Sequence, residues 1–174
     1  MRFAYPCSLF ALCALTHGDA QAPGPEPRLC GKVPLTARDS ARQAPDPLQR
    51  AARELARRLV ALDAAVEHGA LFYRTAEGSI RVGEISVGDH RSVDLAVATL
   101  PGEALVGALH THARFEYHTS EQWRLSREDI ALGRRLLALS RTDPALRLFI
   151  VDVGNATLSE YAASGRCRVW RNRP

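Results

Sequence analysis

The chain has 174 residues, enough for one domain with a sizeable core and too few for two ordinary domains. Hydrophobic residues make up 46% of the chain and charged residues 24%, so the composition favours neither a disordered chain nor a membrane-embedded helical bundle. The net charge of +4 comes from arginines that are dispersed and not interleaved with stacking aromatic residues, so we expect no nucleic-acid partner.

Residues 1–15 begin with one arginine and continue as an apolar run, a pattern typical of a signal peptide. We expect the signal peptide to span residues 1–20, with cleavage after Ala20 and a periplasmic or secreted mature protein. Neither Cys7 nor Cys13 follows the small residue that a lipoprotein signal requires, so lipidation is the less favoured alternative.

Two cysteines, Cys30 and Cys167, remain when this leader is removed. In an oxidising compartment, a disulfide between them would stabilise the fold by about 4 to 5 kcal/mol on the chain-entropy estimate. The sequence does not show whether the two side chains face each other, so paired and free cysteines both stay open. No later segment is apolar over the length needed to cross a bilayer, so we expect no integral membrane segment in the mature form.

Residues 21–46 are rich in Pro, Ala, Gly and Arg without a sustained period, which predicts an arm or linker. Asp46 and Pro47 then have the N-cap and first-turn chemistry of a helix. We expect that helix to end near Glu67, with Gly69 as its C-terminal cap. Its buried face is predicted from apolar residues three or four positions apart, namely Leu48, Ala52, Leu55, Leu59, Leu62 and Val66.

Strands are expected after this helix. Residues 70–74 and 79–82 flank a turn-forming sequence, which predicts a β-hairpin. A third strand is expected at Val93–Thr99. Residues 104–109 form a short apolar run between chain breakers, which predicts a buried central strand that ends at His110.

A second helix is predicted over Ser126–Ser140, followed by strands at 146–153 and 158–162 and by a last short strand at 168–170. This order of elements predicts an α+β domain over residues 47–174. Its central mixed β-sheet would be flanked by two main helices.

The predicted central strand carries the sequence His110-Thr111-His112 at its end. Side chains at positions i and i+2 of a strand project from the same face about 6 to 7 Å apart, so both imidazoles can reach one metal ion. Asp129, in the first turn of the next helix, can supply a third ligand and leave a fourth position for water. Ser126 and Asp129 also have the spacing of a helix capping box, so a purely structural role is the alternative.

The order of these residues is similar to the JAMM motif of the JAB/MPN metallopeptidases. In that motif a Glu, a His-x-His and a Ser-x-x-Asp follow one another, as do His110, His112 and Ser126-x-x-Asp129 here. The resemblance covers residues 48–162. It implies the cytidine-deaminase-like JAB/MPN architecture, a Zn²⁺ cofactor and cleavage of an amide or isopeptide bond in a peptide or protein substrate.

The JAMM motif requires a Glu upstream of the histidines, and three candidates are present. Glu67 lies at the predicted helix-to-strand junction, where the family has its Glu, whereas Glu77 is in a turn and Glu84 is on the next strand. Residues 66–73 also resemble a small bacterial JAMM-like domain found in Rhs-type and other secreted proteins. We therefore prefer Glu67 as the general base, and the resemblance implies that Ser126 donates a hydrogen bond to the developing oxyanion.

This chain departs from the family pattern between the second histidine and the serine. Thirteen residues, 113–125, intervene, more than in the family, and Ala113 stands where the family commonly has proline. An insertion in a surface loop has a small entropic cost, so the ligand set is unaffected. Its aromatic residues are candidate substrate-binding side chains, namely Phe115, Tyr117 and Trp123.

Two other functions are alternatives to an exported zinc hydrolase of the JAMM type. One is a non-catalytic binding or interaction module on the JAB/MPN scaffold, although such members usually lose the ligands that this chain has kept. The other is a metal-dependent nuclease or a zinc deaminase. It is the least favoured, because a zinc deaminase requires a Cys-x-x-Cys arm and Cys30 and Cys167 are far apart in the sequence.

Overall fold

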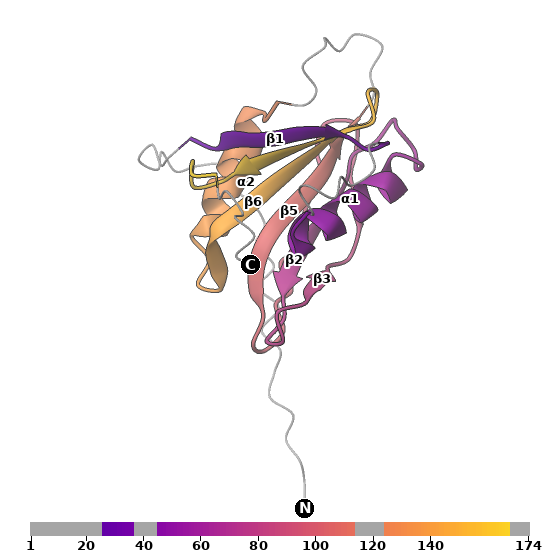
Figure 1. The fold of residues 1–174 in the computed structure, drawn as a ribbon. Coiled ribbons are helices and arrows are strands. Elements are labelled where there is room, and N and C mark those ends of the chain that lie inside the picture. Colours follow the sequence, from indigo (N-terminus) through magenta and orange to yellow (C-terminus); the bar gives the residue numbers. More distant parts are fainter. Residues whose placement is uncertain (1–25, 37–44, 114–123, 168–174) are drawn as a thin grey trace, which may run out of the picture.

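The computed structural model describes residues 26–36, 45–113 and 124–167 (Figure 1). Within these residues, a mixed seven-stranded sheet has the strand order β1-β7-β6-β5-β2-β3, with β4 paired to β2, and two helices pack on it. The predicted α+β class with a central mixed sheet and two flanking helices is confirmed. The leader expected at 1–20 and the strand expected at 168–170 lie outside the described residues.

The central strand is β5, which pairs with β2 in antiparallel and with β6 in parallel orientation. The helices are α1 (Pro47–Leu59) and α2 (Arg127–Leu137). The strands are β1 (Arg28–Pro34), β2 (His68–Arg74), β3 (Ile80–Val82), β4 (Ser86–Val87), β5 (Ala104–His112), β6 (Thr142–Asp152) and β7 (Thr157–Ala162).

Helix α1 begins where the sequence predicts it. The Asp46 carboxylate accepts the Gln49 N–H at 2.9 Å and the Gln49 side chain accepts the Asp46 N–H at 3.2 Å, which together form a capping box. Pro47 occupies the first helical position, where no N–H donor is needed. The buried face of α1 consists of predicted residues together with one more alanine, namely Leu48, Ala52, Leu55, Ala56 and Leu59.

The predicted end of this helix was wrong. The helix ends at Leu59, not near Glu67, although the apolar spacing continues beyond it. The Asp63 carboxylate accepts the N–H of Ala65 at 2.9 Å, a turn that competes with further helical hydrogen bonds. Gly69 is therefore no helix cap, and it lies within β2.

The strand predicted at Val93–Thr99 was also wrong, whereas the predicted hairpin is present as β2 and β3. Side chains of this segment alternate between half-buried and exposed, as they would in a strand. However, side chains satisfy its backbone at Ala98, where the Tyr73 hydroxyl accepts the N–H and Arg81 donates to the carbonyl, both at 3.0 Å. The short strand β4 pairs with β2 instead.

A strand lies inside the range 21–46 that the sequence predicts to be an arm or linker. Strand β1 pairs in antiparallel orientation with β7 and forms one edge of the sheet (Figure 1). A disulfide joins Cys30 of this strand to Cys167, with the two Cα atoms 5.4 Å apart. The two ends of the described chain are therefore fastened to the same edge.

The sheet separates two hydrophobic cores. One contains the buried face of α1 together with Phe72, Phe149 and Val151, and the rings of Phe72 and Phe149 meet edge to face at 6.0 Å. The other contains Leu148, Ile150 and residues of α2. Successive residues of β6 thus face different helices. Phe149 and Val151 face α1, whereas Leu148 and Ile150 face α2.

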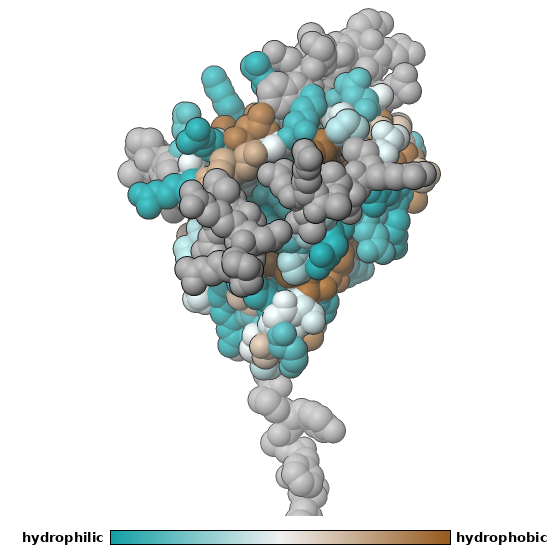
Figure 2. Space-filling view, in the orientation of Figure 1, coloured by the Kyte–Doolittle hydropathy of each residue, from teal (hydrophilic) through white to brown (hydrophobic). Residues whose placement is uncertain are grey.

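The described surface is mostly hydrophilic on the face drawn in Figure 2, with smaller groups of hydrophobic residues between polar side chains. Within the described ranges, no helix combines the length and the hydropathy needed to span a bilayer. The longer of the two described helices, α1, has 13 residues, and one of its faces is buried against the sheet.

Candidate metal centre

The end of β5 carries two histidines on the sheet face that α2 covers. His110 and His112 are two positions apart on the strand, so both side chains point to the same side. Asp129, in the first turn of α2, lies opposite them. Its Oδ1 atom is 3.0 Å from Nε2 of His110 and its Oδ2 atom is 3.4 Å from Nε2 of His112.

These three side chains form a group that could hold a metal ion. One ligand atom from each of His110, His112 and Asp129 lies within 4.8 Å of the other two. The side chains of His110 and Asp129 are 8% and 11% exposed, whereas that of His112 is 17% exposed. The group is therefore largely shielded from solvent, and His112 is its most exposed member.

The start of α2 fixes the position of Asp129. The Ser126 hydroxyl accepts the Asp129 N–H at 3.0 Å, and Oδ2 of Asp129 accepts the Ser126 N–H at 2.7 Å. The capping box that the sequence offered as an alternative is therefore present. It does not exclude a ligand role, because the same carboxylate also faces both histidines.

The electrostatics of Asp129 favour its charged form. Burial alone would raise the pKa of this carboxyl group, but His110 and His112 outweigh burial through charge and hydrogen bonds and hold the pKa far below its ordinary value. The group is thus ionised at any physiological pH, as a carboxylate ligand must be.

Glu67 precedes β2 and lies beside His112 in the register of the sheet. Strands β2 and β5 are antiparallel with Gly69 opposite His110, and the same spacing places Glu67 opposite His112. Opposed residues in an antiparallel pair share a face, so Glu67 is on the face of the histidines. Its N–H donates to the carbonyl of Asp89 at 2.7 Å, which fixes this backbone position.

The environment of Glu67 differs from that of the other two upstream carboxylates. Burial raises the pKa of Glu67, and the charges of His110 and His112 oppose that rise only in part. Glu77 is fully exposed in its turn, and Glu84 is exposed in the connection between β3 and β4. Of the three candidates, Glu67 is half-buried and electrostatically linked to the histidines.

Gly69 gives His110 the space it occupies. A Cβ atom at position 69 would lie 2.7 Å from a methyl group of Leu95, 3.0 Å from the carbonyl oxygen of Leu109 and 3.2 Å from Cβ of His110. The methyl group can move, but the carbonyl belongs to the paired strand and cannot. A glycine is therefore needed beside the first histidine.

The candidate substrate-binding residues Phe115, Tyr117 and Trp123 lie outside the described residues, so their relation to the metal centre stays a prediction. The described chain leaves β5 at Ala113, which is 4% exposed, and resumes at Arg124. Both of these points are within five residues of a predicted ligand.

The sequence did not single out two residues on the same sheet face. Tyr161 of β7 is buried, which raises its pKa to about 12, and its hydroxyl accepts the N–H of Leu125, just before α2. Asp152 ends β6 and is fully buried. Position alone could have flagged Asp152, because a carboxylate at the end of the most apolar strand is unusual. The proximity of Tyr161 to Leu125 depends on how distant strands pair, so no local sequence pattern indicates it.

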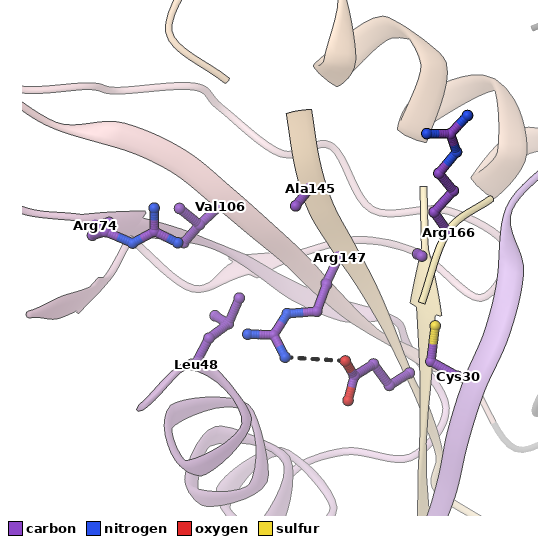
Figure 3. A pocket seen from close by; sticks show the side chains of 9 residues that line it. Cys30, Leu48, Arg74, Val106, Ala145, Arg147 and Arg166 are labelled. Atoms are coloured by element: carbon purple, nitrogen blue, oxygen red, sulfur yellow. Dashed lines mark hydrogen bonds and ion pairs between the residues drawn. The ribbon is translucent and has the colours of Figure 1, made fainter. Parts of the chain in front are cut away.

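A pocket on the opposite face of the sheet contains three arginines. Arg147 points from β6 toward the start of α1, with Arg74 and Arg166 at the pocket's sides (Figure 3). Arg147 donates to both oxygens of Asp46, at 2.7 and 2.8 Å, and to Glu160 at 3.0 Å. The guanidinium charge is thus compensated within the protein, and we assign this pocket a structural role.

Comparisons with known protein families, curated proteins and solved structures give no significant match to this chain. Its function must therefore be inferred from the arrangement of its own residues.

Proposed function

We propose that this protein is an exported zinc hydrolase of the JAMM type that cleaves an amide bond in a peptide or protein. The observation that carries the proposal is the meeting of His110, His112 and Asp129 from a strand end and a helix start. Glu67, at the level of His112 on the same face, adds a carboxylate that is suited to proton transfer.

The donor set supports zinc as the cofactor. Two imidazole nitrogens and one carboxylate oxygen are a common ligand set for catalytic zinc, which keeps one further position for water. Tetrahedral zinc with bonds of about 2.0 to 2.1 Å has ligand atoms roughly 3.3 Å apart. His110 and His112 contact different oxygens of Asp129, at 3.0 and 3.4 Å, and one ligand atom from each of the three residues lies within 4.8 Å of the other two, so binding of zinc would draw these atoms together.

Each further residue has a chemical role in this proposal. When bound, zinc supplies an electrophile that makes water nucleophilic near neutral pH and polarises a carbonyl group. Glu67 accepts the proton that the attacking water loses and delivers it to the leaving nitrogen. The exposed Ser126 hydroxyl donates a hydrogen bond to the carbonyl oxygen as that oxygen gains negative charge.

Export is part of the same proposal. The apolar N-terminal run is typical of a signal peptide, and the Cys30–Cys167 disulfide is consistent with an oxidising compartment. We propose a periplasmic or secreted location, and a peptide or protein substrate over a nucleic acid.

The test combines metal analysis with hydrolysis. Protein produced with its disulfide formed is expected to contain about one zinc ion per chain and to cleave members of a mixed peptide and isopeptide library, followed by mass spectrometry. Glu67→Gln should keep the zinc and lose about 10²- to 10⁴-fold in rate. Glu84→Gln makes the same chemical change at an exposed carboxylate and should keep both properties.

Three results would oppose the proposal. Less than about a tenth of a zinc ion per chain, after refolding with zinc in excess, would rule out the metal centre. Full activity of Glu67→Gln in a zinc-loaded protein would remove the proposed base. Zinc binding without hydrolysis of any library member would favour the non-catalytic binding module.

A further inference from the structure

Thr111 stands between the two candidate histidine ligands but faces the other side of the sheet. Side chains alternate along β5, so that of Thr111 points away from the face of His110 and His112. Its register partner on β6 is Val151, which belongs to the core beneath α1. Thr111 is 0% exposed, so a substrate cannot reach its hydroxyl group.

The Thr111 hydroxyl accepts a hydrogen bond where the regular pairing of β2 with β5 ends. The last paired residues at this end are Gly69 and His110. One position further, the N–H of His68 donates to Oγ1 of Thr111 at 2.8 Å. Strand β5 meanwhile stays in register with β6 as far as His112. The threonine side chain thus extends the connection between β2 and β5 by one residue.

This hydrogen bond acts on the peptide group that follows Glu67. A peptide group is planar, so the Glu67 carbonyl and the His68 N–H move as one unit. The carbonyl accepts the N–H of Gly88 at 2.8 Å, and the N–H donates to Thr111. The Glu67 N–H itself donates to the carbonyl of Asp89 at 2.7 Å. Both peptide groups beside Glu67 are therefore held, which sets the direction in which its side chain leaves the backbone.

The three bonds connect Glu67 to two different parts of the chain. Gly88 and Asp89 connect it to the segment after β4, whereas Thr111 connects it to β5. Thr111 is covalently bonded to both His110 and His112, so its hydroxyl fixes the backbone of Glu67 relative to both histidines. A displacement of about 1 Å in a reacting group can lower a rate about 100-fold, so a bond at this place affects the chemistry.

We propose that Thr111 is a positioning residue for Glu67. From the far side of the sheet, its hydroxyl sets the position of the proposed base relative to the two histidines, through the His68 N–H. The inference rests on the proposed function and adds a residue to which the JAMM resemblance assigned no role.

Two variants of Thr111 separate positioning from a purely structural role. Thr111→Val keeps the β-branched shape but leaves the buried N–H of His68 without its acceptor. Thr111→Ser keeps the hydroxyl and removes a buried methyl group. Both changes should lower the unfolding midpoint, but only the first removes the hydrogen bond. Thr142→Val is the matched control, because the buried Thr142 hydroxyl has no hydrogen-bond partner in the described part of the chain.

Steady-state kinetics and zinc affinity give the first readout. Thr111→Val should lower kcat about 10- to 100-fold and keep KM and zinc affinity within about twofold, because the ligands themselves stay in place. Thr111→Ser and Thr142→Val should keep kcat within about threefold of the wild type. If kcat instead follows the unfolding midpoint in both Thr111 variants, or is unchanged in Thr111→Val, the inference is wrong.

Amide hydrogen exchange of the metal-free protein gives a second readout that does not depend on activity. The His68 amide should exchange about 5- to 10-fold faster in Thr111→Val than in Thr111→Ser or Thr142→Val. Equal exchange in the three variants would overturn the inference. A wild type that cleaves no substrate would overturn the proposed function, whereas faster His68 exchange confined to Thr111→Val would still support the hold of Thr111 on the backbone of Glu67.

Discussion

Nε2 of His110 lies 3.0 Å from Oδ1 of Asp129, although the first residue is near the end of β5 and the second is in the first turn of α2, beyond a long connection. This contact joins the central strand to α2 at the point where both elements have polar residues. Because His112 faces the other oxygen of the same carboxylate, all three side chains converge on a volume of the size of one ion.

Zinc should therefore stabilise the fold, since these residues are brought together only in the folded chain. Zinc at about 100 times its dissociation constant should raise the free energy of unfolding by about 2.7 kcal/mol. His110→Ala should abolish most of this gain. His90→Ala removes an exposed histidine that is not one of the three candidate ligands and should retain the gain. Thermal unfolding with and without zinc measures the effect, and equal gains in all three proteins would contradict it.

Gly69→Ala should damage both stability and metal binding. The new Cβ would lie 3.0 Å from a backbone oxygen of β5 and 3.2 Å from Cβ of His110, so the two strands must separate at the histidine. We expect a loss of about 1 to 3 kcal/mol in unfolding free energy and weaker zinc binding. Gly31→Ala is the control, because no atom lies within 4 Å of its new Cβ. Comparable effects at both glycines would count against this explanation.

The Asp46–Arg147 ion pair should make the free energy of unfolding depend on pH. Burial opposes ionisation of Asp46, but Arg147 and the Gln49 N–H outweigh it and keep the pKa below its ordinary value of 3.8. The pair therefore stabilises the fold above that pH, and its contribution is lost as the pH falls through the lowered pKa.

Asp46→Asn should cost about 3 kcal/mol at neutral pH, because Arg147 stays buried with Glu160 as its remaining anionic partner. Its unfolding free energy should then fall less steeply than that of the wild type between about pH 5 and pH 3. Urea unfolding across this range measures both curves. Parallel curves would show that Asp46 does not titrate as inferred.

Reduction of the disulfide should loosen the edge of the sheet at β1. The bond between Cys30 and Cys167 closes a loop with a sequence separation of 137, so its loss should cost about 2 to 5 kcal/mol. A reductant should lower the thermal midpoint of the wild type and leave a Cys30→Ser/Cys167→Ser variant unchanged. A wild-type midpoint that does not respond to the reductant would contradict the expected contribution.

Local sequence patterns predicted the elements that carry the three candidate ligands. The apolar run before His110 and the Ser126-x-x-Asp129 capping box are local signals, and both elements formed there, although β5 continues to His112 and α2 ends at Leu137 instead of Ser140. Strand β1 had no such signal. It contains Gly31, Lys32 and Pro34, and it exists because β7 offers a partner far along the chain.

Long-range pairing also explains what was predicted wrongly or missed at the site. Val93–Thr99 has the alternation of a strand, yet the β2 edge pairs with β3 and β4 and leaves this segment outside the sheet. The sequence did not indicate Asp152 as a site residue, because its position beside His112 follows from the parallel register of β5 and β6. A single sequence contains no local trace of such a register.

The parallel pairing of β5 and β6 has a consequence for how this protein could diversify. Parallel neighbours require a crossover, and here the connection leaves β5 just after His112 and rejoins described structure at Arg124, shortly before Asp129. The chain between these points starts and finishes beside the metal centre without supplying a predicted ligand. Under the proposed function, evolution can therefore exchange that segment to change the substrate while the three candidate ligands stay in place.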